Sequence, residues 1–184
     1  GCWLISDEVY HQITFNNFVA PSFLQFSNPK DKLIVINSAS KSFNMTGWRI
    51  GWITHPEELG SHIAKLVQIT TTGVPEFLQN GLVSALENHI SITNEIRKNL
   101  KKSRDIMFDR LVTWKKVECS IPEAAFYAFF RVKGIKDSLH FAKKLILETN
   151  VGVAPGIAFG TSGEGYLRIC FAAKESFINQ IMDR

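Results

Sequence analysis

Residues 33–41 read Leu-Ile-Val-Ile-Asn-Ser-Ala-Ser-Lys, an apolar run that passes directly into a hydroxyl-rich loop and a lysine. The apolar part is short and rich in β-branched side chains, which is typical of a buried strand, so we predict a strand over residues 33–37. Ligands of open α/β sheets bind in the crevice beyond the carboxyl ends of the strands. The sequence therefore places Lys41 where such a sheet would have a binding site.

The loop and the residues after it carry groups suited to a phosphorylated aldehyde. A deprotonated lysine amine adds to an aldehyde and forms an imine, which is the route to Schiff-base catalysis. Hydroxyls at Ser38 and Ser40 can donate to phosphate oxygens, and the planar guanidinium of Arg49 can bind a phosphate through two parallel charge-assisted bonds. An isolated lysine on a polar loop is usually only solvated, so the interpretation depends on the wider sequence.

The wider sequence over residues 38–52 is S-A-S-K-S-F-N-M-T-G-W-R-I-G-W. It resembles the lysine segment of fold-type I aminotransferases (class I/II, the aspartate aminotransferase superfamily), which use pyridoxal 5′-phosphate (PLP). The specific part of the match is a lysine followed eight positions later by an arginine, inside M-T-G-W-R-x-G-W. The resemblance implies that Lys41 binds the cofactor aldehyde as an imine, and that Ser38 and Arg49 bind the cofactor phosphate.

A second element lies near the start of the chain, where Asp7-Glu8-Val9-Tyr10 follows a strand predicted over residues 2–6. It resembles the D-x-x-Y element of the same family. The resemblance implies that Asp7 pairs with the protonated pyridine nitrogen and that Tyr10 donates its hydroxyl to the ring oxygen. An anionic partner keeps that nitrogen protonated, so the ring can accept electron density from the substrate. Without the match, Asp7 would be interpreted as a turn or cap carboxylate and Tyr10 as a packing aromatic.

A third element lies near the other end, where residues 166–172 read Tyr-Leu-Arg-Ile-Cys-Phe-Ala. An arginine inside an alternating apolar strand needs an anion, because a buried unpaired charge is expensive. The pattern resembles the family's late R-I/L-x-x-A/S strand, which implies that Arg168 binds the substrate α-carboxylate as a bidentate pair. A structural salt bridge is the alternative. Residues 153–160 resemble the family's glycine-bearing loop that lines the substrate pocket.

Composition indicates a chain that can bury a core, since 45 % of its 184 residues are hydrophobic and 21 % are charged. No apolar run approaches the roughly 20 residues that span a bilayer, and the first residues do not form a basic region followed by an apolar stretch. We therefore expect a cytoplasmic protein with no membrane partner. The 3 cysteines and 5 histidines show no metal-ligand spacing, so we expect reduced thiols and no metal site.

The formal charge of +4 and a local basic cluster raise the question of nucleic-acid binding. A helix explains the cluster better, because apolar residues recur at three- and four-residue intervals and leave the lysines on a solvated face. We therefore expect no nucleic-acid partner. The apolar positions are Ile96, Leu100, Met107, Leu111 and Trp114, with Ser103 or Arg104 in the gap, and the basic residues are Arg97, Lys98, Lys101, Lys102, Lys115 and Lys116.

Strands and helices alternate along the chain, which favours an α/β fold with a mostly parallel sheet covered on its faces. One helix is predicted after Pro56, a second helical region runs from Pro75 to about Trp114 with a break within it, and another helix is predicted at the C-terminus. A further helix is predicted over residues 137–148, and further strands over residues 48–54, 126–132 and 151–154 and around Arg168. The resemblance implies two domains: residues 1–100 are the C-terminal part of the large PLP-binding domain, and residues 101–184 are the small α+β C-terminal domain.

The match covers only about the C-terminal half of a typical family member. The resemblance implies that an upstream half supplies the glycine-containing turn for the phosphate, the aromatic that stacks on the pyridine ring and the asparagine that partners the ring oxygen. Gly1-Cys2-Trp3 begins within a predicted strand, which indicates a cut sequence. A strand without its neighbours exposes unpaired backbone groups and apolar faces, so we expect the isolated chain to be poorly soluble or inactive.

For the full-length protein, the resemblance implies a PLP-dependent aminotransferase that moves an amino group between an L-amino acid and a 2-oxo acid and acts as a homodimer. Two alternatives stay open, since a fold does not fix a function. One is a carbon–sulfur β-lyase of the same fold, which would release pyruvate and ammonia. The other is an aminotransferase-like effector domain of a transcription regulator, which an upstream DNA-binding domain would identify. Aspartate, aromatic, alanine and broader substrate specificities all stay open.

Overall fold

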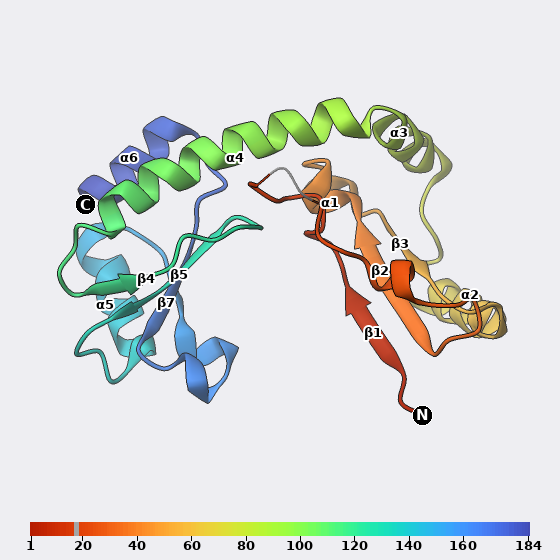
Figure 1. Cartoon of the computed structure of the whole chain (residues 1–184), viewed down its shortest axis with the longest axis horizontal. Coiled ribbons are helices and arrows are strands. Elements are labelled where there is room, and N and C mark those ends of the chain that lie inside the picture. The colour runs from red at the N-terminus through yellow and green to blue at the C-terminus, as the bar shows by residue number, and fades with distance from the viewer. Residues whose placement is uncertain (17–18) are drawn as a thin grey trace. The chain divides into compact units, whose positions relative to one another are not determined.

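The computed structural model describes residues 1–16 and 19–184. The chain forms two compact units, Gly1–Arg97 and Lys98–Arg184, and each contains one β-sheet (Figure 1). Helices accompany the strands in both units, which confirms the predicted α/β class, and the one parallel pairing among the described strands joins the first two of them.

The first sheet has three strands in the order β1-β2-β3, namely β1 (Leu4–Asp7), β2 (Leu33–Ser38) and β3 (Gly51–Thr54). β1 runs parallel to β2, and β3 runs antiparallel to it. One edge of the sheet therefore holds the carboxyl ends of β1 and β2 together with the amino end of β3. The third strand is shorter than predicted, because Thr46–Trp48 forms a 3₁₀ turn and Arg49 is left-handed with φ 53°.

One buried cluster of the first unit is built largely from the lysine segment. Buried and partly exposed residues alternate along β2, so its two faces have different surroundings. The short helix α1 (Ala39–Ser42) and the turn after it then supply most of the buried cluster. This cluster consists of Ala39, Phe43, Met45, Ile50 and Ala85, with Trp52, Val74, Leu82 and Ile92 packed against it. A fully buried Phe, Met or Ile contributes about 1.5–3 kcal/mol, so packing fixes the loop that carries Lys41.

Three longer helices follow the first sheet, namely α2 (Gly60–Thr70), α3 (Glu76–Glu87) and α4 (His89–Leu111). Pro56 precedes a 3₁₀ turn that leads into α2, and Pro75 directly precedes α3. Proline suits these starts because the first N–H groups of a helix have no partner within it. Asn88 separates α3 from α4 and provides the predicted break. Within residues 1–16 and 19–184, no helix has the length and apolar character needed to cross a bilayer.

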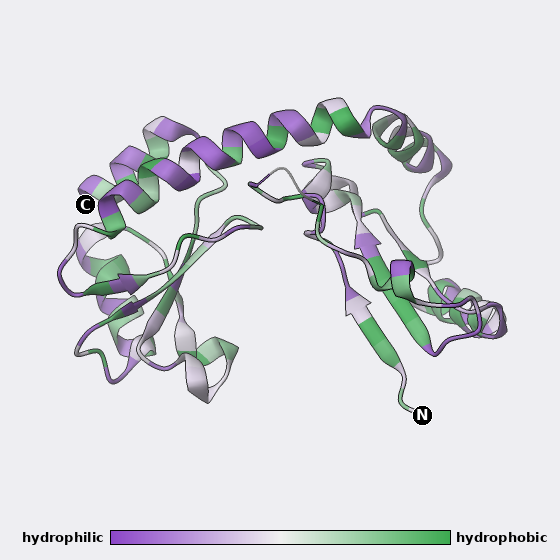
Figure 2. Cartoon of the chain, in the orientation of Figure 1, coloured by the Kyte–Doolittle hydropathy of each residue, from purple (hydrophilic) through white to green (hydrophobic). Residues whose placement is uncertain are grey.

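The helix α4 has the predicted apolar stripe as far as Leu111. Leu100, Met107 and Leu111 are buried, and Ser103 and Arg104 lie buried in the gap between them. Trp114 does not extend the stripe: the helix ends at Leu111, and Trp114 lies in the following turn with 42 % of its surface exposed. Polar and apolar bands alternate along the helix in Figure 2.

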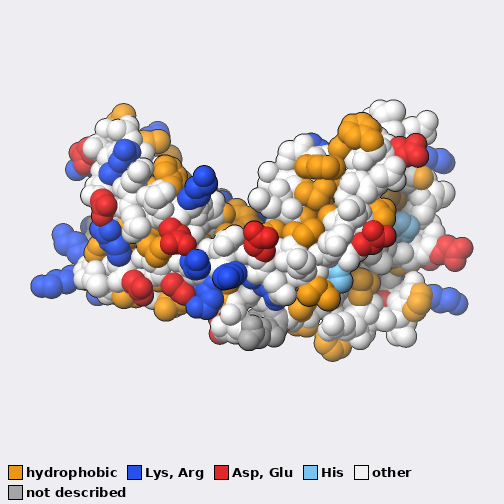
Figure 3. Space-filling view, turned by 90° about the horizontal axis from the view of Figure 1, so that it is seen from above, with side chains coloured by type: hydrophobic (Ala, Val, Ile, Leu, Met, Phe, Trp, Pro, Cys, Tyr) orange, Lys and Arg blue, Asp and Glu red, His pale blue; other side chains and the backbone are white. Residues whose placement is uncertain are grey.

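The basic face of α4 is compensated by acidic groups. Lys101 pairs with Asp105 at 2.7 Å and Lys102 with Glu175 at 3.5 Å, and both lysines are exposed. Basic and acidic side chains are interspersed over the face of the molecule drawn in Figure 3. These features agree with the predicted solvated face.

The second sheet is antiparallel throughout and has the order β4-β5-β7-β6. Its strands are β4 (Val117–Cys119), β5 (Tyr127–Val132), β6 (Ala154–Pro155) and β7 (Tyr166–Cys170). Two helices accompany it, α5 (Ser138–Thr149) and α6 (Glu175–Asp183). The short strand β4 was not predicted. A strand was predicted over residues 151–154, but residues 151–153 make no sheet pairing, so β6 begins at Ala154.

Candidate active site

Four of the predicted cofactor residues lie at the same edge of the first sheet. Asp7, the last residue of β1, lies opposite Ile36 of β2, two residues before Ser38. Residues two apart on a strand share a face, so Asp7 and Ser38 lie on the same face at the same edge. Lys41 and Arg49 belong to the segment that leaves this edge at the end of β2 and returns to it at β3.

Two hydrogen bonds join the segment after β1 to the elements that carry the lysine. The Glu8 N–H donates to the Ile36 carbonyl at 2.9 Å, and the Ser42 hydroxyl donates to the Val9 carbonyl at 3.5 Å. Tyr10 lies in the turn that follows and is half-buried. The D-x-x-Y element and α1 are therefore held together, although they are far apart in sequence.

The Ser38 hydroxyl organises the start of α1. It accepts the Ser40 N–H at 3.1 Å and donates to the Ile50 carbonyl at 3.4 Å. The Ala39 N–H donates to the same carbonyl at 3.1 Å. The 3.4 Å contact is long for an O–H···O bond, so the hydroxyl can donate its hydrogen bond to a phosphate oxygen instead of the Ile50 carbonyl. Lys41 follows on α1 and is half-buried.

Arg49 is exposed and held by its own turn. Its Nη1 donates to the Thr46 carbonyl at 2.9 Å, and its left-handed backbone closes the 3₁₀ turn. Trp48, the preceding residue, packs on α3 at Gly81, where an added Cβ would come within 2.4 Å of the indole ring. Only glycine allows this approach, so α3 fixes the turn that presents Arg49.

Two polar residues at this edge were not singled out from the sequence. Glu8 is buried, and its Oε1 accepts the Ser6 hydroxyl at 3.1 Å and the Phe23 N–H at 3.0 Å. Asn37 is buried on β2, and within the described residues its Oδ1 has no hydrogen-bond partner. The only sequence signal for either was its position beside a motif residue.

Arg168 lies in the second unit, on β7, with its guanidinium against two aromatic rings. The Cζ atom lies 4.3 Å from the Tyr127 ring centroid and 4.3 Å from the Phe159 ring centroid. The side chain is half-buried, and among the described residues no carboxylate lies within ion-pair distance of it. The structural salt bridge considered as an alternative is therefore not formed within the described residues.

The loop predicted to line the substrate pocket lies beside Arg168. Ala154 of β6 pairs directly with Arg168, and the next 3₁₀ turn, Gly156–Phe159, carries the Phe159 ring to the guanidinium. Phe159 also makes an edge-to-face contact with Phe129, with ring centroids 5.9 Å apart. Such aromatic and cation–π contacts stabilise by about 0.5–2 kcal/mol each.

Hydrogen bonds anchor this loop to the start of α5. The buried Ser138 hydroxyl accepts the Ile157 N–H at 3.2 Å. The Glu164 carboxylate accepts the N–H of Gly165 at 2.8 Å and that of Ser138 at 2.7 Å. These backbone bonds, first that from Gly165 and then that from Ser138, hold the pKa of Glu164 below its ordinary value.

We expect Glu164→Gln to lower the free energy of unfolding of the full-length protein at pH 7, and the loss to disappear under acid conditions. Because the pKa is lowered in the folded state, the ionised carboxylate stabilises the fold above the unfolded pKa. This contribution is lost as pH falls through the folded value. Urea unfolding at pH 7 and near pH 3 measures both effects. Glu148→Gln is the control, because Glu148 is an exposed partner of Lys144 on α5, and an equal, pH-independent loss in both variants would contradict the prediction.

The chemistry of the donor set at the first sheet fits PLP. A carboxylate at Asp7 suits a protonated ring nitrogen, a primary amine at Lys41 suits an aldehyde, and donors at Ser38 and Arg49 suit a phosphate. Gly51 keeps β3 close to this edge, since a Cβ there would meet the Asn37 carbonyl oxygen at 2.6 Å. An α/β sheet with these groups at one edge has the features of a PLP-binding protein.

The whole chain, residues 1–184, matches the family model described as aminotransferase class I and II. The chain therefore belongs to the class I and II aminotransferase family, which confirms the resemblance of the lysine segment.

Curated relatives have aminotransferase names. The chain is 36 % identical to an LL-diaminopimelate aminotransferase of Natranaerobius thermophilus, over 98 % of this chain and 47 % of that protein. It is 33 % identical to a probable N-acetyl-LL-diaminopimelate aminotransferase of Bacillus subtilis, over 99 % of this chain and 46 % of that protein. The chain thus spans about half the length of the curated relatives it matches.

Solved structures agree with this assignment. An aromatic aminotransferase from Pyrococcus horikoshii superimposes with a TM-score of 0.90 at 30 % identity, over 98 % of this chain and 49 % of that one. An aspartate aminotransferase from Thermotoga maritima superimposes with a TM-score of 0.86 at 31 % identity, over 98 % and 46 % of the two chains.

Proposed function

We propose that the full-length protein is a PLP-dependent aminotransferase that moves an amino group between an L-amino acid and a 2-oxo acid. The observation that carries this proposal is the convergence of Asp7, Ser38, Lys41 and Arg49 at one edge of the first sheet. Membership of the aminotransferase family supports it, as do the names of the relatives.

The residues at this edge bind different parts of the cofactor. Ser38 and Arg49 bind the phosphate, Tyr10 donates to the ring oxygen, and Asp7 keeps the ring nitrogen protonated. Bound PLP supplies an electron sink for the electron pair left at the substrate α-carbon. Lys41 would hold the aldehyde carbon of the cofactor through its amine, and the same amine, when it is free of the cofactor, would move a proton at the substrate α-carbon.

Arg168 binds the substrate α-carboxylate through its planar N–H fork. The two aromatic rings against the guanidinium support this role, because an arginine stacked on rings still donates in its own plane. We further propose that residues 1–100 belong to the large PLP-binding domain and that residues 101–184 form the small domain, close to the two compact units Gly1–Arg97 and Lys98–Arg184. The family supports a homodimer, and the free cysteines support a reducing, cytoplasmic setting.

The full-length protein with PLP tests this proposal. We would supply 2-oxoglutarate with LL-diaminopimelate, aspartate, phenylalanine or alanine, which cover the chemistry named for the relatives together with a small substrate. We expect stoichiometric transfer of the amino group to 2-oxoglutarate from at least one donor, with parallel-line kinetics typical of two half-reactions.

Other outcomes identify the alternatives. Release of pyruvate and ammonia from a cysteine thioether without amino transfer would indicate a β-lyase. PLP binding with no turnover of any amino acid, in a protein that also binds DNA, would indicate an effector domain.

A further inference from the structure

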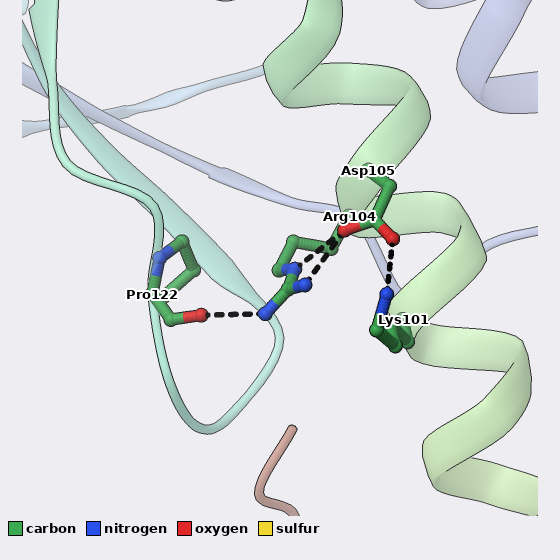
Figure 4. A network of polar contacts seen from close by, with 4 residues as sticks. All are labelled: Lys101, Arg104, Asp105 and Pro122. Atoms are coloured by element: carbon green, nitrogen blue, oxygen red, sulfur yellow. Dashed lines mark hydrogen bonds and ion pairs between the residues drawn. The ribbon is translucent and has the colours of Figure 1, made fainter. Parts of the chain in front are cut away.

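Arg104 is a buried arginine whose hydrogen bonds extend beyond its own helix. Only 8 % of the residue is exposed. Its Nε and Nη2 donate to Asp105 Oδ1 at 2.9 and 2.7 Å, and its Nη1 donates to the Pro122 carbonyl at 3.1 Å (Figure 4). Burying a guanidinium is costly unless it is fully paired, and Figure 4 shows it directed at the loop that contains Pro122.

The partner of Arg104 is kept ionised by its surroundings. Partial burial acts to raise the pKa of Asp105, but hydrogen bonds from Lys101 and Arg104 outweigh it and leave that pKa lowered. Lys101 donates to Asp105 Oδ2 at 2.7 Å. The carboxylate therefore orients the guanidinium, and Nη1 donates to the Pro122 carbonyl.

The loop between β4 and β5 contains one residue in a strained backbone conformation, and hydrogen bonds hold the loop on both sides of that residue. Ala125 has φ 61°, in the left-handed region that a residue with a Cβ rarely adopts. Such a conformation persists only where the surroundings determine it. Arg104 holds the Pro122 carbonyl on one side, and the Phe171 N–H holds the Phe126 carbonyl at 2.9 Å on the other.

The end of this loop sets the position of the ring that contacts Arg168. Phe126 contacts the Tyr127 ring with centroids 4.9 Å apart, and Tyr127 is the first residue of β5. The Tyr127 ring then lies 4.3 Å from the Arg168 Cζ atom. A guanidinium donates in its own plane, so a ring fixed against its face also fixes the direction of its N–H fork.

We propose that Arg104 is a positioning residue for Arg168. It holds the Pro122–Phe126 loop, which places the Tyr127 ring, which in turn orients the Arg168 guanidinium for the substrate carboxylate. This inference rests on the proposed function, since only there is Arg168 the substrate arginine.

A second arginine of α4 provides a matched control. Arg110 also joins an aspartate and a backbone carbonyl, with Nη1 on Asp183 at 2.5 Å and Nη2 on the Met182 carbonyl at 2.9 Å. Its contacts tie α4 to α6 and do not involve the loop before β5. A loss that comes only from weaker tertiary anchoring of α4 should therefore appear in both variants.

The experiment compares Arg104→Met, Arg104→Lys and Arg110→Met in the full-length protein with PLP. Steady-state kinetics with the best amino acid gives KM and kcat, and hydrogen–deuterium exchange follows the peptide that covers residues 120–127. For Arg104→Met we expect KM to rise about tenfold with kcat changed less than about threefold, and exchange over residues 120–127 to accelerate. Arg104→Lys should raise KM less than Arg104→Met does, because the lysine ammonium can still donate to the Pro122 carbonyl. Arg110→Met should change neither KM nor exchange in this peptide.

A double variant tests the route through the ring. If Arg104 acts through Tyr127, then Arg104→Met should leave KM unchanged in a Tyr127→Leu background. The effects of two substitutions are not additive when both residues act through the same series of contacts. An undiminished KM effect in that background would overturn the proposal, and so would unchanged exchange over residues 120–127 in Arg104→Met. An unchanged KM in Arg168→Lys would contradict the proposed substrate role of Arg168. The exchange measurement does not depend on turnover, so it would still test whether Arg104 holds the loop.

Discussion

Lys41→Ala in the full-length protein should abolish amino transfer, with kcat reduced by at least about 10⁴-fold. The expected loss is large because one amine has two tasks, covalent binding of the cofactor aldehyde and proton transfer at the substrate α-carbon, and general acid–base catalysis alone contributes about 10²–10⁴-fold. Borohydride reduction followed by peptide mass spectrometry measures the first task directly. The wild-type protein should give a PLP-modified peptide that contains Lys41, and the variant should give none.

Lys65→Ala is the matched control for this experiment, since Lys65 is an exposed lysine of α2 in the same unit. It should keep both the modified peptide and the activity. Lys41 is half-buried on a four-residue helix, so urea unfolding should accompany the assay to show that the variant is folded. A folded Lys41→Ala protein that retains amino transfer would refute the assignment of the lysine.

The shared position of Asp7, Ser38, Lys41 and Arg49 at one edge of the first sheet could be predicted, because these residues are close in sequence or follow strands that run parallel. Ser38, Lys41 and Arg49 lie within one segment, whose order is fixed by the chain itself. Asp7 ends β1, and parallel strands bring their carboxyl ends to one edge. The position of β2 was also accessible, because its β-branched run between polar segments is a strong local signal, whereas β3 begins later than predicted.

The surroundings of Arg168 could not be predicted from the sequence, because they depend on pairing between distant strands. Phe129 lies opposite Arg168 only through the antiparallel register of β5 and β7. A shift of one residue would turn the aromatic side chains of β5 to the other face. The sequence expectation that Arg168 needs an anion therefore missed the two aromatic rings that contact its guanidinium in the structure.

Side-chain anchors were missed for a related reason. Glu8 binds the Phe23 N–H, and Arg104 binds the Pro122 carbonyl, so each contact joins segments that local patterns treat separately. Arg104 was considered as one of two residues in the gap of an apolar stripe, and its burial follows from that position. Its partner could not be inferred, because the β4 strand that precedes the Pro122 loop has only three residues and gives little signal.

Arg168→Lys should reduce kcat/KM for the amino acid by about 10²–10³-fold, mainly through a higher KM. Lysine keeps the positive charge but replaces a planar fork with a single point charge, so one of two parallel bonds to the carboxylate is lost. Disrupting a desolvated charge pair costs about 2–5 kcal/mol, and each 1.4 kcal/mol is a tenfold change. The flat guanidinium also fits against the Tyr127 and Phe159 rings in a way that an ammonium does not.

Arg131→Lys separates this effect from the general effect of replacing an arginine of this sheet by lysine. Arg131 lies on β5 opposite Tyr166, on the same face as Phe129, which lies opposite Arg168, but it is exposed and lies 4.0 Å from Glu118. Since exposed ion pairs contribute little, its replacement should change kcat/KM less than about twofold. Binding of PLP should be unaffected in both variants, because the proposed cofactor contacts lie in the first unit. Equal effects of the two substitutions on KM would contradict the prediction, whereas a loss confined to Arg168→Lys is the result expected if Arg168 binds the carboxylate through two parallel bonds.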